Sequence, residues 1–454
     1  MSGIFSLPCS WQMHLVRISV LCLFFFLNGC GNSSGDGGNQ VSWTGSKQIG
    51  APNNEETSCN SVAIDSGDNI YLTGYTTGRV NGNLQMGTGD LILVKYDSNG
   101  NHQFTRQLGV AGAETLGSSL AIDSGDNVYV AGWTKGGLDG NALIGTRDLI
   151  LVKYDSNGNR QFTRQFGVAG AETLSSGVAI DSGDNIYLTG YTGGGLDGNT
   201  VTGTMDFFLT KYDSSGTRQY TRQLGVTAEI TYSSSVTIDS GDNVYLAGYT
   251  TGGLDGNTLT GKLDFFLTKY DNNGIRQFTR QLGTAAAYTA GNDAAINSSD
   301  YVYLAGGTDG GLDGNTLTGD TDFFVTKYDS TGTRQYTSQL GVAGAATADR
   351  GVAVDNGDNV YVTGLTNGGL DGNTLSWPGH YDMFLTKYDN GGSKLYTRQL
   401  GVAGGADTKG HSVAVDSHDN VFVTGVTYGG LDGNTRIGII DCFVTKYDST
   451  GAKQ

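Results

Sequence analysis

The sequence predicts an all-β protein: a single seven-bladed β-propeller of four-stranded antiparallel blades, closed by an N-terminal strand that completes the last blade. Three observations predict this fold. A short phrase recurs seven times, each copy has turn residues placed for four short strands, and the strand missing from the last copy appears near the start of the chain. The composition agrees, because 74 glycines and only 3 prolines among 454 residues favour short strands joined by tight turns.

Internal repetition dominates the sequence. The phrase Asp-Ser-Gly-Asp-Asn-Ile/Val-Tyr and its altered copies begin at Asp65, Asp123, Asp181, Asp239, Asn297, Asp355 and Asp416. A second landmark, Lys-Tyr-Asp, begins at Lys95, Lys153, Lys211, Lys269, Lys327, Lys387 and Lys446. The first phrase is spaced by 58 residues five times and then by 61. A β-helix would need much shorter repeats, and horseshoe or helical solenoids would need leucine ladders or amphipathic helices.

The third copy illustrates the four strands, which we expect at residues 177–180, 186–191, 206–212 and 219–224. Asp, Asn and Gly fill the connections and favour tight hairpins. The third of these strands is apolar at consecutive positions, from Phe207 to Leu209, so both of its faces should be buried. A blade packed between two neighbours has this property.

Ring closure is predicted from the two ends of the chain. The sequence stops shortly after Asp448, before the fourth strand of the last copy. Residues 43–50 match the pattern of the fourth strands with one extra residue. We therefore expect this segment to lie beside residues 441–447, which removes the free edge of the ring.

Residues 1–29 are typical of a lipoprotein signal peptide. The apolar run 18–27 is too short to span a membrane and is followed by Cys30. Residues 27–30 resemble a lipobox, although Asn28 is an unusual residue at its position. We expect Cys30 to be lipidated; an ordinary signal peptide cleaved nearby is the alternative, and Met13 offers a second possible start.

The remaining chain divides into a flexible tether, 30–40, and the propeller, 41–454. We expect a bacterial envelope protein held at the membrane only by its lipid, either periplasmic or surface-exposed. A closed ring has no strand edge that requires a partner, so a monomer is expected.

Segments such as residues 61–76 and 175–192 resemble the bacterial β-propeller repeats known as SBBP repeats. The resemblance covers all seven copies and rests on the core V-A-I/V-D-x-x-G/H-D/N-I/V-Y/F-L/V-x-G. It implies a propeller in an exported bacterial protein, and it implies no catalytic residues. The fifth copy departs most, with Asn297 at the turn and Gly307 where the other copies carry Tyr, Trp, Leu or Val.

Charge and motifs narrow the function. A formal net charge of −17 argues against a nucleic-acid partner. The sequence shows no familiar nucleophile motif and no metal-spaced Cys/His cluster. We expect a non-catalytic binding or scaffolding protein for a protein or glycan partner. The alternatives are an exported carbohydrate-active enzyme (a lyase or hydrolase) and a purely structural envelope protein.

Recurring charged residues have two interpretations each. Asp residues open every third strand, and another set lies in Leu-Asp-Gly-Asn. Calcium binding is one hypothesis for these sets, and turn capping is the favoured alternative. The recurring Lys and Arg residues could form an anion site, but charge that protects the outer strand edges is the favoured interpretation.

The repeat is broken mainly in the loops of the sixth and seventh copies. We define the upper face as the one bearing the loops between copies and the loops between second and third strands. The candidate ligand-binding residues on this face are Trp377, His380, Tyr381, Lys409, His411, Tyr428, Arg436, Arg350 and Arg79. Trp, Tyr, Arg and His are residue types that anchor interfaces and sugar rings. Drift in a tolerant loop is the alternative.

Two cysteines lie in copies that are neighbours only if the ring closes. Cys59 is expected just before the first strand of the first copy, and Cys442 in the third strand of the last. We hypothesise a disulfide across the closure. The alternative is two small buried thiols.

Overall fold

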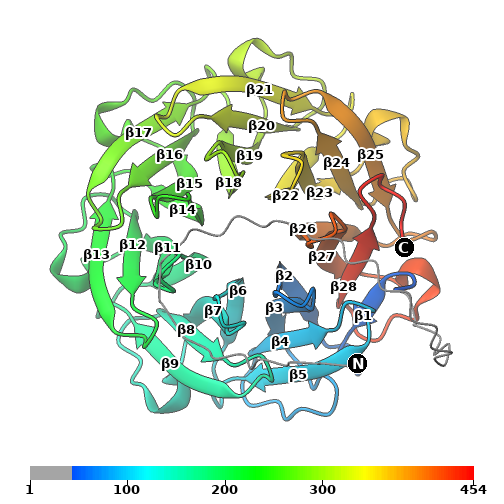
Figure 1. Cartoon of the computed structure of the whole chain (residues 1–454), viewed down its shortest axis with the longest axis horizontal. Helices are drawn as coiled ribbons and strands as arrows, with labels where there is room; N and C mark the ends of the chain where they lie inside the picture. The colour runs from blue at the N-terminus through cyan, green and yellow to red at the C-terminus, as the bar shows by residue number, and fades with distance from the viewer. Residues whose placement is uncertain (1–42) are drawn as a thin grey trace, which may run out of the picture. The chain divides into compact units, whose positions relative to one another are not determined.

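The computed structural model describes residues 43–454, which form a ring of seven four-stranded antiparallel sheets around a central axis (Figure 1). The innermost strands line a polar channel along this axis. The predicted seven-bladed propeller is confirmed. The signal peptide, the tether and Cys30 lie outside the described residues. Among the residues described, no helix is long and apolar enough to cross a membrane.

Each blade has four strands, ordered from the channel outwards. The innermost strands are β2 (Thr57–Ile64), β6 (Thr115–Ile122), β10 (Thr173–Ile180), β14 (Thr231–Ile238), β18 (Thr289–Ile296), β22 (Thr347–Val354) and β26 (Thr408–Val415). The second strands are β3 (Ile70–Thr76), β7 (Val128–Thr134), β11 (Ile186–Thr192), β15 (Val244–Thr250), β19 (Val302–Thr308), β23 (Val360–Thr366) and β27 (Val421–Thr427).

The third strands are β4 (Asp90–Tyr96), β8 (Asp148–Tyr154), β12 (Asp206–Tyr212), β16 (Asp264–Tyr270), β20 (Asp322–Tyr328), β24 (Asp382–Tyr388) and β28 (Asp441–Tyr447). The outer strands are β5 (His102–Leu108), β9 (Arg160–Phe166), β13 (Arg218–Leu224), β17 (Arg276–Leu282), β21 (Arg334–Leu340), β25 (Lys394–Leu400) and β1 (Lys47–Ile49). Short 3₁₀ helices follow the second strands of blades two to seven: η1 (Leu138–Gly140), η2 (Leu196–Gly198), η3 (Leu254–Gly256), η4 (Leu312–Gly314), η5 (Leu370–Gly372) and η6 (Leu431–Gly433).

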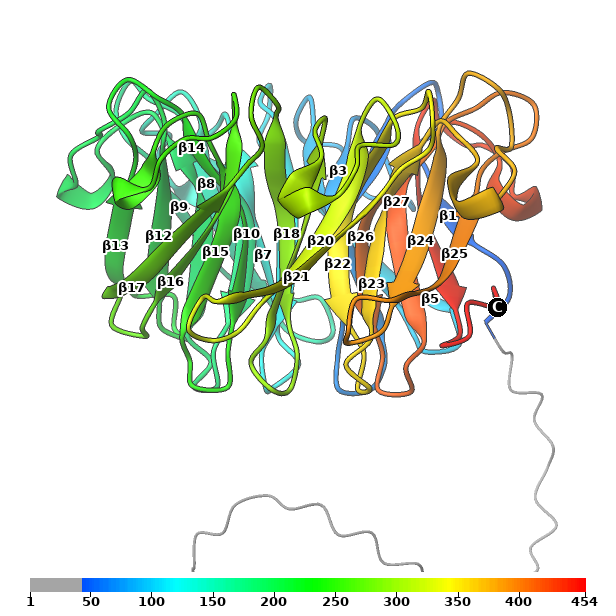
Figure 2. The ribbon, with the colours of Figure 1, turned by 90° about the horizontal axis from the view of Figure 1, so that it is seen from above.

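The two faces of the ring differ. The long loops and the short helices lie on one side, and tight hairpin turns lie on the other (Figure 2). The hairpin turns use the expected residues: Asp184 adopts φ 60° and Gly216 adopts φ 77°. Both values lie in the left-handed region that Asp and Gly tolerate best. The turns on the lower face therefore keep nearly the same residues in every copy, and the loops whose sequences differ between copies lie on the upper face.

The innermost strands are longer than predicted. In blade three the strand is β10, Thr173–Ile180, whereas only residues 177–180 were expected. Ser175 pairs with Gly190 and Gly177 pairs with Thr189, which leaves Ser176 unpaired in a β-bulge. The bulge interrupts the apolar/polar alternation, and the small polar residues around it resemble a loop in sequence. For the same reason Cys59, Arg350, Lys409 and His411, all predicted in loops, lie within innermost strands.

The closure is built as predicted. β1 pairs with β28 in the seventh blade, with Ile49 opposite Cys442. Trp43 packs edge-on against Phe422 of the same blade at 5.3 Å between ring centroids. Cys59 of blade one and Cys442 form a disulfide across the junction. The bond thus joins the first and last blades in addition to the strand exchange.

The hydrophobic core lies between blades. Phe207, Phe208 and Leu209 are all fully buried, as their consecutive placement predicts. Phe207 of blade three stacks on Phe266 of blade four at 5.2 Å between ring centroids. Each apolar layer is shared by two neighbouring blades, so a blade depends on its neighbours for burial.

Candidate functional site

The recurring carboxylates hold the upper loops together. Asp206, the first residue of β12, is fully buried and accepts hydrogen bonds from the backbone N–H groups of Thr202 and Gly203, both at 2.7 Å. It also accepts one from the Gln223 amide at 3.0 Å. Asp197 forms an ion pair with Arg218 at 2.7 Å. These contacts give the carboxylates structural partners, and calcium binding stays an untested hypothesis.

The recurring cations connect neighbouring blades. Arg222 donates through Nε to the Gly274 carbonyl at 2.9 Å and through Nη2 to the Asn273 carbonyl at 3.2 Å. Lys211 donates to the Asn272 carbonyl of the same turn at 3.1 Å. The expectation that these cations mainly protect an outer edge is therefore incomplete, because their donors are used by the next blade.

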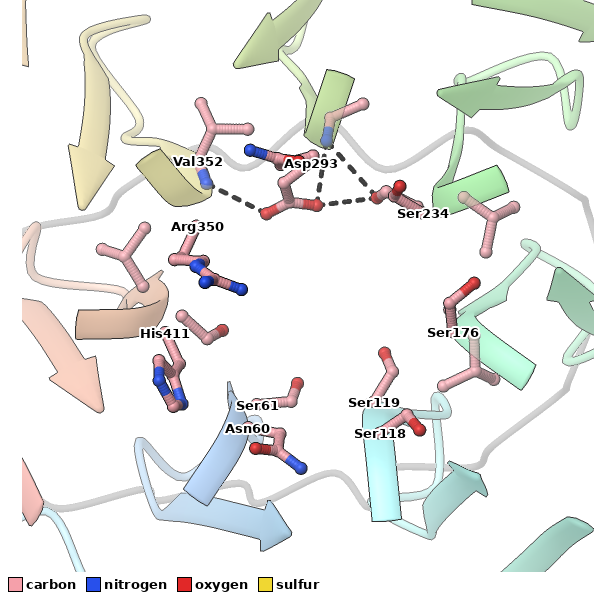
Figure 3. A pocket seen from close by; sticks show the side chains of 18 of the residues that line it. Asn60, Ser61, Ser118, Ser119, Ser176, Ser234, Asp293, Arg350, Val352 and His411 are labelled. Carbon is pink, nitrogen blue, oxygen red and sulfur yellow. Dashed lines mark hydrogen bonds between the residues drawn. The ribbon is translucent and has the colours of Figure 1, made fainter. Parts of the chain in front are cut away.

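One side chain per blade occupies the bulge of the innermost strand and faces the central channel (Figure 3). We call these seven residues the bulge ring. Its members are Asn60, Ser118, Ser176, Ser234, Asn292, Arg350 and His411. Together with the residues that follow them they line a cavity of about 250 Å³. Hydroxyl and amide groups dominate five of the positions, so the cavity wall is polar.

Four members of the bulge ring donate to the next blade, and the fourth of them, His411, is described below. Asn60 donates to the Gly117 carbonyl at 2.8 Å, and Ser176 donates to the Ser233 carbonyl at 2.5 Å. Asn292 donates to the Asp349 carbonyl at 3.3 Å. These contacts connect adjacent bulges around the channel.

Arg350 differs from the other members. Its side chain is exposed in the channel, and within residues 43–454 it makes no hydrogen bond or ion pair that meets ordinary distance limits. A guanidinium has five N–H donors in a planar fork. Arg350 therefore presents a full set of unused donors in a polar cavity.

His411 is the neighbour of Arg350 in the ring. Its Nδ1 lies 3.0 Å from the Cys59 carbonyl oxygen. A carbonyl only accepts, so Nδ1 carries the proton and Nε2 is left as an acceptor. Burial and, to a smaller extent, the positive charge of Arg350 lower the pKa of His411 to about 4. The imidazole is neutral at pH 7 and can accept a hydrogen bond or a proton.

Two buried carboxylates lie on this side of the ring, and one of them, Asp293, lines the cavity (Figure 3). Asp293 accepts hydrogen bonds from the Ser235 hydroxyl at 2.7 Å and the Val352 N–H at 2.9 Å, and burial raises its pKa. Burial also raises the pKa of Asp349 to about 7. Asp349 Oδ1 accepts from the Asn292 amide at 3.1 Å, while its Oδ2 has no hydrogen-bond partner among the described residues.

The other predicted site residues form a separate cluster on the upper face, around Asp407. His380 Nδ1 lies 2.9 Å from Asp407 Oδ1, and Lys409 Nζ lies 3.0 Å from Asp407 Oδ2. Lys409 Nζ also lies 5.2 Å from the ring centroids of both Tyr381 and Tyr428.

Three further predicted residues lie around this cluster. Trp377 is 47% exposed, and Arg436 donates to the Tyr428 carbonyl at 3.1 Å. Arg79 is exposed and makes no polar contact with the rest of the described chain. The predicted set is therefore divided between the upper cluster and the channel, where only Arg350 and His411 lie.

Most of the residues that line the channel were not predicted from the sequence. Asn60, Ser118, Ser176, Ser234 and Asn292 were not identified because the innermost strands were predicted to begin after them. A usable signal was present: these positions keep the 58-residue step, and Arg350 and His411 fall in the same series.

Comparison with known proteins agrees with the repeat. The family model described as "SBBP: Beta-propeller repeat" matches residues 45–79, 103–139, 161–197, 219–255, 335–371 and 395–432. The chain belongs to the SBBP β-propeller repeat family. The matched stretches leave out the fifth copy, the one whose turn and second strand depart most from the pattern.

Two curated proteins resemble this SBBP propeller over part of their length. An uncharacterized WD repeat-containing protein of Acanthamoeba polyphaga mimivirus is 21% identical over 74% of this chain and 32% of its own length. Regulatory protein FlaEY of Caulobacter vibrioides is 25% identical over 69% of this chain and 36% of its own length. The chain spans about a third of the length of these relatives.

Solved structures share the fold at low identity. An ulvan lyase from a new family of polysaccharide lyases is 12% identical, with a TM-score of 0.51, over 90% of this chain and 97% of its own. A streptogramin B lyase is 10% identical, with a TM-score of 0.49, over 88% of this chain and 96% of its own. At such identities the likeness shows the fold alone.

Proposed function

We propose that this SBBP propeller is a binding protein that takes an anionic, hydroxyl-rich ligand in the central channel at the level of the bulge ring. The observation that carries the proposal is Arg350, an exposed guanidinium that lies in a polar cavity and has no hydrogen-bond or ion-pair partner among residues 43–454. Four of the other blades carry Ser, Ser, Ser and Asn along the same ring, from Ser118 to Asn292.

The chemistry of the lining supports such a ligand. A guanidinium binds carboxylate or phosphate oxygens through two parallel hydrogen bonds. Ser and Asn side chains both donate and accept, which matches ligand hydroxyls. The neutral His411 adds an acceptor beside the cation. Because the bulges are connected from blade to blade, the lining is held in place before the ligand arrives.

We also propose the cellular setting. Lipidation of Cys30 would hold the propeller at a bacterial membrane, where a monomeric ring acts as a binding or scaffolding module. Metabolic labelling with a palmitate analogue tests the anchor. Label on the wild-type protein and none on Cys30→Ser is the expected result, and label retained by Cys30→Ser would contradict the anchor.

An enzyme is the second candidate, favoured by His411. A neutral imidazole beside an arginine can abstract a proton from a ligand whose acid group the arginine holds. An exported polysaccharide lyase or hydrolase is the corresponding activity. Release of unsaturated or reducing-end products from uronate polymers by wild-type protein, absent in His411→Gln, would favour the enzyme over the binding protein.

The decisive test of the binding site removes the positive charge of Arg350. Galacturonic acid is titrated by calorimetry into the wild-type protein and into Arg350→Gln, which keeps hydrogen-bonding capacity but not the charge. We expect the affinity to fall by about tenfold to a hundredfold, since a charge-assisted contact is worth about 1.5–3 kcal/mol.

Arg79→Gln is the matched control, because it removes the same charge from an exposed loop residue that makes no polar contact with the described part of the chain. It should bind like the wild-type protein. Equal affinity for Arg350→Gln and the wild-type protein would contradict the proposal.

A further inference from the structure

Aromatic side chains gather at the upper ends of blades one to four. We call Tyr75, Trp133, Tyr191, Tyr232 and Tyr249 the aromatic strip. Four of them are the next-to-last residues of the second strands, and Tyr232 is the second residue of β14. The equivalent second-strand residues of blades five to seven are Gly307, Leu365 and Val426. The strip therefore occupies one side of the ring.

The strip is a partly exposed surface with unused polar groups. The Tyr191 and Tyr232 rings lie 4.1 Å apart, and those of Tyr232 and Tyr249 lie 5.3 Å apart, measured between centroids. All three side chains are only partly buried. Their hydroxyls and the Trp133 indole N–H have no hydrogen-bond partner among residues 43–454. Side chains with an apolar ring and an unpaired polar tip are suited to sugar rings, which combine apolar faces with hydroxyls.

The strip is adjacent to the channel. Tyr232 precedes the bulge residue Ser234 by two positions in the same strand, a separation of about 7 Å at the usual strand rise. The cations beside the strip are paired with carboxylates, Lys135 with Glu114 at 2.7 Å and Arg147 with Glu172 at 3.4 Å. Both cations also lie over the Trp133 ring, at 5.9 and 4.8 Å from its centroid, so a sugar ring can contact only the part of Trp133 that they leave open. Uncharged parts of a ligand match the strip, and its anionic group matches Arg350.

The two features lie on opposite sides of the opening. Figure 3 places Arg350 across the channel from Ser176, which belongs to β10, the innermost strand of blade three. Tyr191 and Tyr232 flank that side, in blades three and four. A ligand that contacts both features must therefore extend across the opening, which an oligosaccharide can do.

We propose that the aromatic strip and the bulge ring form one binding surface for an acidic oligosaccharide, with a uronate carboxylate on Arg350 and further sugar rings on Tyr191, Tyr232 and Trp133. This inference rests on the proposed function and adds the ligand class and its direction across the channel. Affinity then depends on the length of the saccharide.

The experiment compares galacturonic acid, its dimer and its tetramer. Wild-type full-length protein is expected to bind the tetramer about tenfold or more tighter than the monosaccharide, because additional rings reach the strip. The double variant Tyr191→Ser/Tyr232→Ser should lose this gain and keep the affinity for galacturonic acid. Leu365→Ala, at the equivalent position of blade six, is the matched control and should keep the full length dependence.

A second measurement does not depend on tyrosine substitutions. The tetramer should change the tryptophan fluorescence through Trp133, and Trp133→Phe should abolish that change. Trp43 is buried at the closure, so it should not respond, and the exposed Trp377 is replaced by Phe in both proteins so that it does not contribute to the change. Circular dichroism checks that each variant is folded.

The outcomes separate the two proposals. If the tetramer binds no tighter than galacturonic acid, or the tyrosine variant keeps the gain, the oligosaccharide inference is overturned while the Arg350 site stands. If the fluorescence change persists in Trp133→Phe, the placement on the strip is wrong. If neither saccharide binds the wild-type protein, the proposed function itself fails.

Discussion

Blades three and six show how the same scaffold carries different channel residues. In both, the first residue of the third strand accepts hydrogen bonds from the preceding loop and from a glutamine: Asp206 from Gln223 at 3.0 Å, and Asp382 from Gln399 at 2.9 Å. This holds although the loop before Asp382 is longer by two residues. At the bulge, however, blade three has Ser176 and blade six has Arg350.

The comparison separates two kinds of position. Residues that recur are used by the scaffold, although the longer loop of blade six supplies Asp382 with one backbone donor, the Ser376 N–H at 2.7 Å, where Asp206 has two. The bulge residues that face the channel can differ from blade to blade, because they are not needed to pair the strands. The departures in the bulge ring are therefore the places to look for a ligand, and the following predictions test that division.

The largest effect is expected from a scaffold position. Asp206→Ala leaves two loop N–H groups and the Gln223 amide without their buried acceptor. We expect the free energy of unfolding to fall by about 3–5 kcal/mol, measured by urea denaturation. Ser176→Ala should change it by less than about 1 kcal/mol. Equal losses for the two variants would contradict the division into scaffold and channel positions.

The closure disulfide is expected to have the next largest effect. Cys59 and Cys442 are 383 residues apart in sequence, so their bond closes a very long loop in the unfolded chain. Replacing both by Ser should lower the free energy of unfolding by about 2–5 kcal/mol. Urea denaturation of the double variant, and of the wild-type protein with and without reductant, measures this. An unchanged midpoint would show that the exchange of β1 closes the ring by itself.

The two channel groups should each change the free energy of unfolding by about 3–4 kcal/mol across their titration range, with opposite signs, so that the net pH dependence is about 1 kcal/mol. The pKa of His411 is lowered from 6.5 to about 4, so between these values the unfolded chain binds a proton that the folded protein does not. The free energy of unfolding therefore rises with pH. The pKa of Asp349 is raised from 3.8 to about 7, so the folded protein keeps a proton that the unfolded chain loses. Its contribution falls as the pH rises through this window.

Single variants separate these contributions. In His411→Gln, the free energy of unfolding should still fall with rising pH because of Asp349. In Asp349→Asn, it should still rise with pH because of His411. Urea denaturation at several pH values between 4 and 7 compares the slopes. Identical slopes in the two variants would show that neither group titrates in the folded channel.

The smallest effect on stability is expected in blade five, where a scaffold residue departs from the repeat pattern. Asn297 accepts from the Tyr301 N–H at 2.9 Å, as the turn Asp does elsewhere. It offers no charge to Lys327, which donates to the Asn390 carbonyl at 3.1 Å as Lys269 of blade four does to the Ser330 carbonyl at 3.1 Å. In blade four the equivalent Lys269 lies 3.3 Å from Asp239. Asn297→Asp should raise the thermal midpoint slightly, by up to about 1 kcal/mol in stability, and a lower midpoint would contradict this reason for the departure.

The sequence by itself determined the number of blades, the order of strands and the closure. The 58-residue step, the Asp/Asn/Gly turns and the consecutive apolar residues of Phe207–Leu209 are local or periodic features, and each has one simple structural solution. The segment before Gly50 was recognisable as a strand because it carries the same pattern as its six counterparts.

Only the tertiary structure decided which residues share a site. A bulge shifts side chains from one face of a strand to the other, so the channel-facing positions could not be read from alternation. Arg350 and His411 are 61 residues apart yet are ring neighbours, and the contact of His411 with the Cys59 carbonyl depends on the closure. Burial, which sets the pKa of His411 and Asp349, likewise arises only when seven innermost strands surround one channel.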